Sequence, residues 1–132
     1  MVDLEFPFVP KSTRSLARGQ FWSIPLSDGR FGAGCVIGTH LKEGKQSSRI
    51  FIAGVVRWVG IHPPKAANLQ GQPVISFAFA HLKAITESGG SILGEAELQL
   101  EHAPPEAEAL SMPTWGYGMP RMLAQREAEN AG

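Results

Sequence analysis

An Asp-Gly pair at positions 28 and 29 lies between two apolar runs, residues 21–26 and 31–38, and constrains this chain more than any other feature. Asp-Gly between apolar runs is a strong signal for a β-hairpin, because glycine adopts the positive φ that tight turns require. Pro25 has no backbone N–H, so we expect a loop in which that missing donor costs no cross-strand hydrogen bond. The strand over 21–26 should then lie at or near a sheet edge.

A four-residue loop over 27–30 satisfies this condition and fixes the partners across the hairpin. The expected partners are Leu26 and Phe31, Ile24 and Ala33, and Trp22 and Cys35. Because side chains alternate along a strand, these six residues share one face, and Trp22, Ile24, Phe31 and Cys35 should be buried. A shift of one residue would exchange the two faces.

The other segments predict an α+β protein whose sheet is mainly antiparallel. Apolar runs and alternation indicate strands over 50–59, 74–79 and 92–101, although an apolar run as short as 74–80 is also compatible with a helix. Capping and glycine signals place short helices over 12–19, 81–88 and 120–129, and one helical turn over 106–110. Polar or proline-rich connections cover 40–49, 61–73 and 113–120. We therefore expect a strongly coiled sheet or a small, partly open β-barrel, with short helices near the termini.

Length and composition favour one soluble domain over residues 1–132. Of the 132 residues, 43% are hydrophobic and 18% are charged, which argues against disorder. A single cysteine excludes an internal disulfide and fits a reducing compartment, so we expect a cytoplasmic protein. No apolar run approaches the roughly 18 residues of a membrane span, and the acidic N-terminal stretch does not resemble a signal peptide.

Charge is unevenly distributed along the chain, although the formal net charge is zero. Residues 1–83 hold ten Lys and Arg against four Asp and Glu, whereas residues 84–120 hold six Glu and no Lys or Arg. Such asymmetry indicates a charged partner.

No arrangement of residues in the sequence predicts catalysis, a metal site or a cofactor. The histidines lack the spacing of metal ligands; they are His40, His62, His81 and His102. Cys35 lies on the expected apolar face, where a thiol is structural rather than nucleophilic. No serine lies in a G-x-S-x-G motif. We therefore expect no bound metal, no cofactor and no catalytic group.

Two sets of residues are candidates for contacting a partner. In the strand over 92–101, Glu95, Glu97 and Glu101 point away from the core and form an acidic stripe. The stripe either binds a basic partner or merely keeps the surface soluble and protects a sheet edge. Trp115 and Tyr117 lie in a loop and either pack that loop down or contact a ligand.

The segment IPLSDGRFGAGCVI, residues 24–37, resembles the opening motif of immunity-protein family twenty-six of bacterial polymorphic-toxin systems. Residues 91–94 are similar to a later strand start in that family. Cys35 stands where we expect a basic residue in the motif. The resemblance implies a non-enzymatic, cytoplasmic protein that binds and neutralises a cognate toxin domain, without catalytic residues, and with neither a membrane nor a nucleic acid as its expected partner.

Two other classes of function are compatible with the sequence. A small β-barrel module that binds peptide or nucleic acid would present exposed aromatic residues beside basic ones such as Arg14, Arg18 and Lys45. A small enzyme would need a pocket with convergent titratable groups, and the sequence offers no such set.

Overall fold

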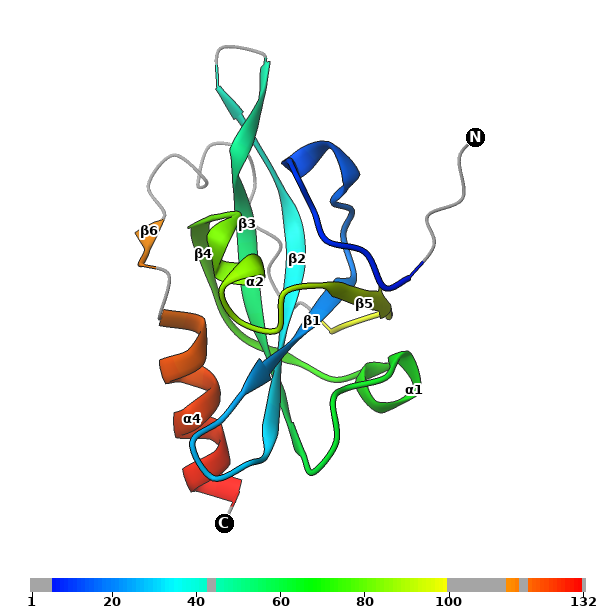
Figure 1. Cartoon of the computed structure of the whole chain (residues 1–132), viewed down its shortest axis with the longest axis vertical. Helices are drawn as coiled ribbons and strands as arrows, with labels where there is room; N and C mark the ends of the chain where they lie inside the picture. Colours follow the sequence, from blue (N-terminus) through cyan, green and yellow to red (C-terminus); the bar gives the residue numbers. More distant parts are fainter. Residues whose placement is uncertain (1–5, 43–44, 100–113, 117–118, 132) are drawn as a thin grey trace.

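The computed structural model describes residues 6–42, 45–99, 114–116 and 119–131. The predicted helical turn over 106–110 lies outside these residues, as do Glu101 and Tyr117. The strands are β1 (Gln20–Pro25), β2 (Phe31–Lys42), β3 (Lys45–Gly60), β4 (Val74–His81), β5 (Ile92–Glu95) and β6 (Thr114–Trp115). They form one open sheet in the order β5-β1-β2-β3-β4-β6, antiparallel throughout except that β6 runs parallel to β4 (Figure 1). The predicted α+β class with a mainly antiparallel sheet is confirmed.

The helices are short except at the C-terminal end. They are η1 (Thr13–Ser15), α1 (Ala66–Leu69), α2 (Lys83–Thr86) and α4 (Met119–Ala131). The Ser12 hydroxyl caps η1 by accepting a hydrogen bond from the Arg14 backbone N–H at 3.2 Å, and Pro120 lies in the first turn of α4, both as predicted. No helix in the described part of the chain is long and apolar enough to cross a membrane.

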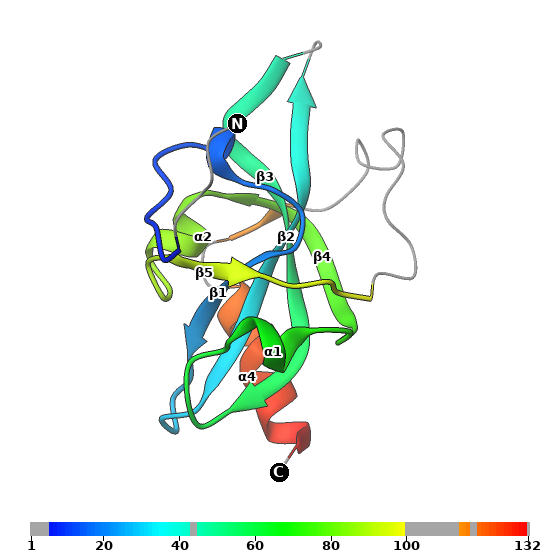
Figure 2. The same cartoon turned by 90° about the vertical axis from the view of Figure 1, so that its right-hand side faces the viewer.

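Both faces of the sheet are buried, each against different helices. One face packs against α2 and α4 and includes Trp22, Ile24 and Phe51. The other face packs against α1 and the segment that follows β5, and includes Phe21 and Cys35. Figure 2 shows α1 and β5 in front of the central strands and α4 behind them. The sheet is therefore the middle layer of the molecule, with β3 at its centre as predicted for residues 50–59.

The register of the β1–β2 hairpin differs by one residue from the predicted register. The observed partners are Pro25 and Phe31, Ile24 and Gly32, Ser23 and Ala33, Trp22 and Gly34, and Phe21 and Cys35. The predictions that Leu26 faces Phe31 and that Trp22 faces Cys35 were therefore wrong. Trp22, Ile24 and Cys35 are buried as predicted, whereas Phe31 is only half-buried. Trp22 and Cys35 lie on opposite faces of the sheet.

The loop between β1 and β2 accounts for this shift. The Leu26 N–H donates to the Arg30 carbonyl at 2.9 Å and the Gly29 N–H donates to the Leu26 carbonyl at 3.3 Å, so the loop has three residues. Gly29 has a φ of +86°, the left-handed conformation that such a loop requires after its type I turn. Loops of two or four residues would leave Leu26 opposite Phe31, and a three-residue loop displaces every pair by one position.

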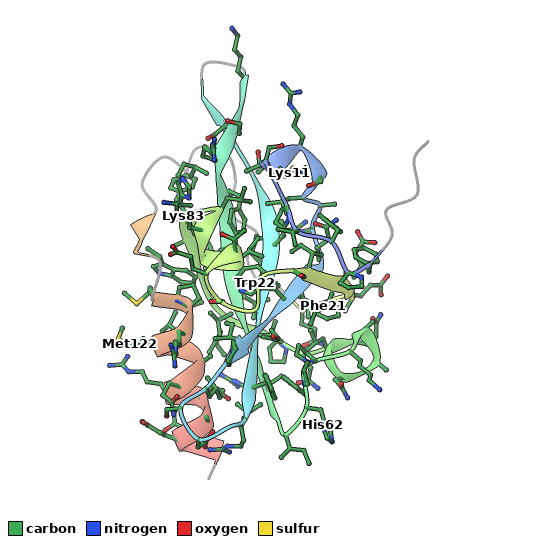
Figure 3. The ribbon with its side chains drawn as sticks, viewed as in Figure 1. Lys11, Phe21, Trp22, His62, Lys83 and Met122 are labelled. Carbon is green, nitrogen blue, oxygen red and sulfur yellow. The ribbon has the colours of Figure 1, made fainter. Side chains whose placement is uncertain are left out.

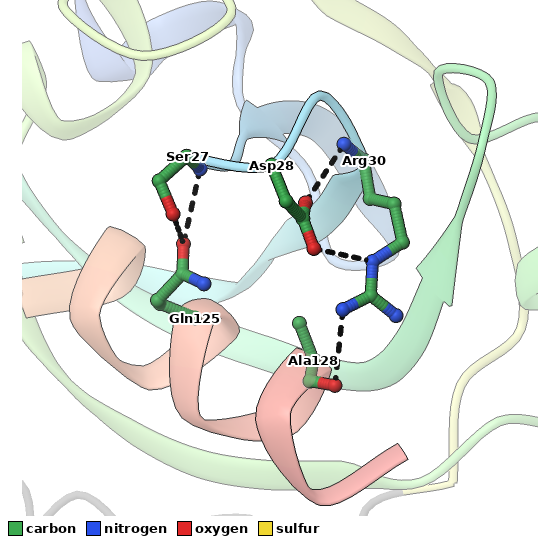
Figure 4. Close-up of polar contacts among 5 residues, drawn as sticks. All are labelled: Ser27, Asp28, Arg30, Gln125 and Ala128. Carbon is green, nitrogen blue, oxygen red and sulfur yellow. Dashed lines mark hydrogen bonds and ion pairs between the residues drawn. The ribbon is translucent and has the colours of Figure 1, made fainter. Parts of the chain in front are cut away.

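Polar contacts attach this loop to α4 (Figure 4). The backbone N–H and the hydroxyl of Ser27 both donate to the Gln125 side-chain oxygen at 3.1 Å. The Arg30 side chain donates to an Asp28 carboxylate oxygen at 2.7 Å and to the Ala128 carbonyl at 3.3 Å. The Arg30 backbone N–H also donates to Asp28, and these hydrogen bonds lower the pKa of the Asp28 carboxyl below its ordinary value.

The predicted polar connection over 40–49 is instead the far end of the hairpin that β2 and β3 form. Strand β2 continues to Lys42 and β3 begins at Lys45, and these two residues are partners in the ladder. Before Ile50 in β3 and after Cys35 in β2, neither strand has another sheet neighbour, and the two project together from the end of the sheet (Figure 1). We call this projection the arm. The prediction failed because most residues of this segment are polar, and a strand of polar residues has no hydrophobic alternation to distinguish it from a loop.

The predicted strand over 92–101 follows β1 only as far as Glu95. Beyond that point the Ala96 N–H donates to the Gly19 carbonyl at 3.0 Å, and the chain crosses to the segment preceding β4. There the Gly71 N–H donates to the Glu97 carbonyl at 2.6 Å, and Gln99 bonds to residues 72 and 74. Figure 2 shows this segment running from β5 across the sheet towards β4. The segment thus connects the β5 edge of the sheet to the start of β4, without closing the sheet into a barrel.

Candidate functional site

The crossing segment and the sheet beneath it enclose a groove of about 460 Å³. Its apolar part comes from β2, β4 and the segment after β5, and consists chiefly of Ile37, Val74 and Leu98, which lie on the same face of the sheet as Cys35. Its charged edge consists of Arg18 and Glu97. A volume of this size falls within the range of small-molecule and side-chain binding sites.

A shallower hollow of about 260 Å³ continues from the groove past the same two charged residues. It adds Gln70 and Glu95 to the lining. The groove therefore opens towards solvent between the Arg18 guanidinium and two carboxylates. No ion pair joins Arg18 to any residue in the described part of the chain.

Backbone hydrogen bonds hold the charged edge in position. The Glu97 N–H donates to the Gln70 side-chain oxygen at 3.1 Å, while the Glu97 carbonyl accepts from Gly71. On the opposite edge, the Gly19 N–H donates to the Val36 carbonyl at 2.9 Å and its carbonyl accepts from Ala96. Since these bonds fix the backbone on both edges, the side chains at positions 18, 95 and 97 project into solvent from a supported frame.

The structure places the predicted partner-binding residues in two different environments. Glu95 and Glu97 are exposed, as alternation along the strand predicts, while Ala96 between them is buried. Trp115 is only 8% exposed and packs in the core on the α4 face, so of its two interpretations the structure favours packing. Glu101 and Tyr117 lie outside the described residues.

Sequence analysis missed the association of Arg18 and Gln70 with the acidic pair. Arg18 was expected at the end of a basic helix, and Gln70 was expected in a featureless loop. Their proximity to Glu97 depends on where the chain crosses the sheet, and no periodicity or motif records that path. Gly19, which was expected to end that helix, has a φ of +94° in the structure and forms the bend between Arg18 and β1.

Two groups in the described ranges have altered pKa values, and both lie away from the charged edge of the groove. Burial raises the pKa of the Cys35 thiol to about 12, and hydrogen bonds from Arg30 lower the pKa of Asp28 in the hairpin loop. Among the described residues, no group of three or more His, Cys, Asp and Glu side chains could hold a metal ion. The lining of the groove combines apolar side chains with charged ones.

Comparison of the chain with protein families, with curated proteins and with solved structures finds no match.

Proposed function

We propose that this chain is an immunity protein, which binds and neutralises a cognate toxin domain without catalysing a reaction. The observation that carries this proposal is the position of an exposed carboxylate pair, Glu95 and Glu97, beside an apolar groove. Protein interfaces concentrate their binding energy where an apolar anchor enters a pocket and a polar rim excludes water. The resemblance of residues 24–37 to an immunity-protein motif supports a toxin domain as the partner.

The charges of the site indicate what the partner presents. Two carboxylates at alternate positions lie roughly 7 Å apart, and they favour Lys and Arg side chains on the facing surface. The groove accommodates one apolar side chain beside those bases, and Arg18 provides one cation for an acidic residue or a carbonyl. A basic toxin domain, such as one that acts on nucleic acid, has the charge that this edge complements.

The test is co-expression with the toxin domain that we expect the reading frame immediately upstream to encode. The wild-type chain should restore growth, and it should bind a catalytically inactive form of the toxin domain in titration calorimetry. The double substitution Glu95→Lys with Glu97→Lys should slow association by roughly 10-fold or more and remove most of its salt dependence. The substitution Leu98→Trp, which fills the groove, should speed dissociation.

A matched control separates the site from a general effect of charge. Glu87 and Glu129 are exposed acids outside the groove lining, so Glu87→Lys with Glu129→Lys makes the same change in net charge. This control should bind as the wild type does. If the wild-type chain neither protects nor binds, the immunity function is wrong. If it binds and the groove variants bind equally well, the proposed face is wrong.

A further inference from the structure

The arm and the short helix η1 bring together cations that are distant in the sequence. The Thr13 hydroxyl donates to the Ser47 carbonyl and attaches η1 to β3 at the start of the arm. Lys11 and Arg14 flank that contact on the η1 side, and Lys45 and Arg49 flank it on β3. We call these four residues the basic end. Figure 3 shows Lys11 in the half of the molecule from which the arm projects.

All four side chains of the basic end are exposed. None of them forms an ion pair with another described residue. A fifth cation, Lys83, is close because the Leu82 N–H donates to the Arg49 carbonyl at 2.8 Å. Glu87 follows Lys83 by one helical turn, so we leave Lys83 out of the basic end.

We infer that the basic end binds the phosphate backbone of double-stranded nucleic acid. A two-stranded β-ribbon fits the major groove of B-DNA, and the arm is a ribbon of this kind. Lys45 and Arg49 are four residues apart, roughly 13 Å along the strand, which equals the axial rise of about four phosphates on one strand of the duplex. This interaction is independent of the proposed groove function, since it uses the opposite charge and other residues.

Duplex fits the described surface better than single-stranded nucleic acid does. Binding of single strands relies on aromatic side chains on which bases stack. Among the described Phe, Trp and Tyr residues only Phe6 is exposed, at 37%, and it packs near Phe8 rather than on the arm. Contacts to phosphates need only cations, and they give binding without sequence preference. The sequence alone did not favour a nucleic acid, because its basic residues are dispersed until folding joins η1 to β3.

The experiment measures binding of the whole chain to a fluorescent 20-base-pair DNA duplex at several salt concentrations. Four phosphate contacts predict a slope of about −3.6 for the logarithm of the binding constant against that of the salt concentration. Affinity should therefore fall roughly 100-fold between 50 and 200 mM salt. The triple substitution Arg14→Ala, Lys45→Ala and Arg49→Ala should reduce the slope to about −1.

The matched control removes three exposed cations elsewhere, with Lys65→Ala, Arg121→Ala and Arg126→Ala. Its net charge equals that of the first variant, and it should keep the wild-type affinity and slope. Circular dichroism and thermal unfolding establish that both variants are folded. The inference is overturned if the duplex does not bind at 50 mM salt, or if both variants weaken binding equally. It is also overturned if polyglutamate of equal charge competes as well as duplex, since that outcome identifies an acidic protein as the partner.

Discussion

Trp22 and Gly34 are direct partners across the β1–β2 hairpin, and the indole of Trp22 occupies the space that a side chain at position 34 would need. A Cβ atom built on Gly34 would lie 2.8 Å from the indole nitrogen and closer still to two ring carbons. Trp22 itself is fully buried and forms an edge-to-face contact with Phe51. The glycine is thus required by the packing of the largest core side chain.

Gly34→Ala should therefore destabilise the fold. The added methyl group forces the Trp22 ring out of its position, and overpacking of a closely packed core costs roughly 1–3 kcal/mol. Denaturant unfolding measures the loss as a shift in midpoint. Gly116→Ala is the control, because a Cβ atom there meets no described atom within 4 Å, and it should change the free energy of unfolding by less than about 0.5 kcal/mol. Equal stability of the two variants would contradict this packing.

The register of the hairpin shows what its sequence could and could not determine. Alternation predicted two strands around Asp28-Gly29, and the missing N–H of Pro25 required a non-hydrogen-bonded pair at that position. A three-residue loop meets that requirement as well as a four-residue loop does, since Pro25 then faces Phe31 outside a hydrogen-bonded pair. Because both faces are apolar, burial did not decide between the two registers.

Ile24→Ala should cost roughly 2–5 kcal/mol of stability. The Ile24 side chain is fully buried on the face that packs against α4, so truncation loses apolar contact and leaves a cavity. Ile61→Ala removes the same atoms from a residue that is 73% exposed and should have little effect. Chemical denaturation of both variants against the wild type provides the measurement. A loss below 1 kcal/mol for Ile24→Ala would be inconsistent with the burial described.

Gln125→Ala tests the attachment of the hairpin loop to α4. This change removes the acceptor of two hydrogen bonds from Ser27, in a partly exposed place where such bonds contribute about 0.5–1.5 kcal/mol. The free energy of unfolding of the variant should fall by an amount in this range, and amide exchange at Ser27 should become faster. Glu129→Ala, an exposed position on the same helix, should leave both properties unchanged. Unaltered exchange at Ser27 in Gln125→Ala would show that the loop does not depend on this contact.

The groove was less predictable than the strands that support it. Exposure of Glu95 and Glu97 followed from alternation, because that pattern is local. The approach of Arg18 and Val74 to Glu97 is not local, since it depends on where residues 96–99 cross the sheet. The arm was missed for the opposite reason: its strand pairing is local, but its residues are mostly polar, so its sequence carries no hydrophobic period.

Cys35 provides a pH-dependent test of the core. It is fully buried opposite Gly54, and burial raises the pKa of its thiol from 9.0 to about 12. Between pH 9 and 12 the Cys35 thiol keeps its proton in the folded state and loses it in the unfolded state. The contribution of this group to stability is therefore complete below pH 9 and is lost as the pH rises towards 12. The free energy of unfolding should fall by roughly 1.5 kcal/mol more in the wild type than in Cys35→Ala between pH 9 and 10.5.

The comparison with Cys35→Ala cancels the titration of lysine and tyrosine residues, which both proteins share. Denaturant unfolding at pH 7.5, 9 and 10.5 gives the difference directly, and below pH 8 it should be constant. The same burial makes the thiol unreactive, because the thiolate is the nucleophile and reagents must reach it. A disulfide reagent at pH 8 should label the folded protein no faster than the protein unfolds. The same reagent should label the denatured protein immediately. Rapid labelling of the folded protein would show that the face containing Cys35, Phe21 and Leu69 opens to solvent.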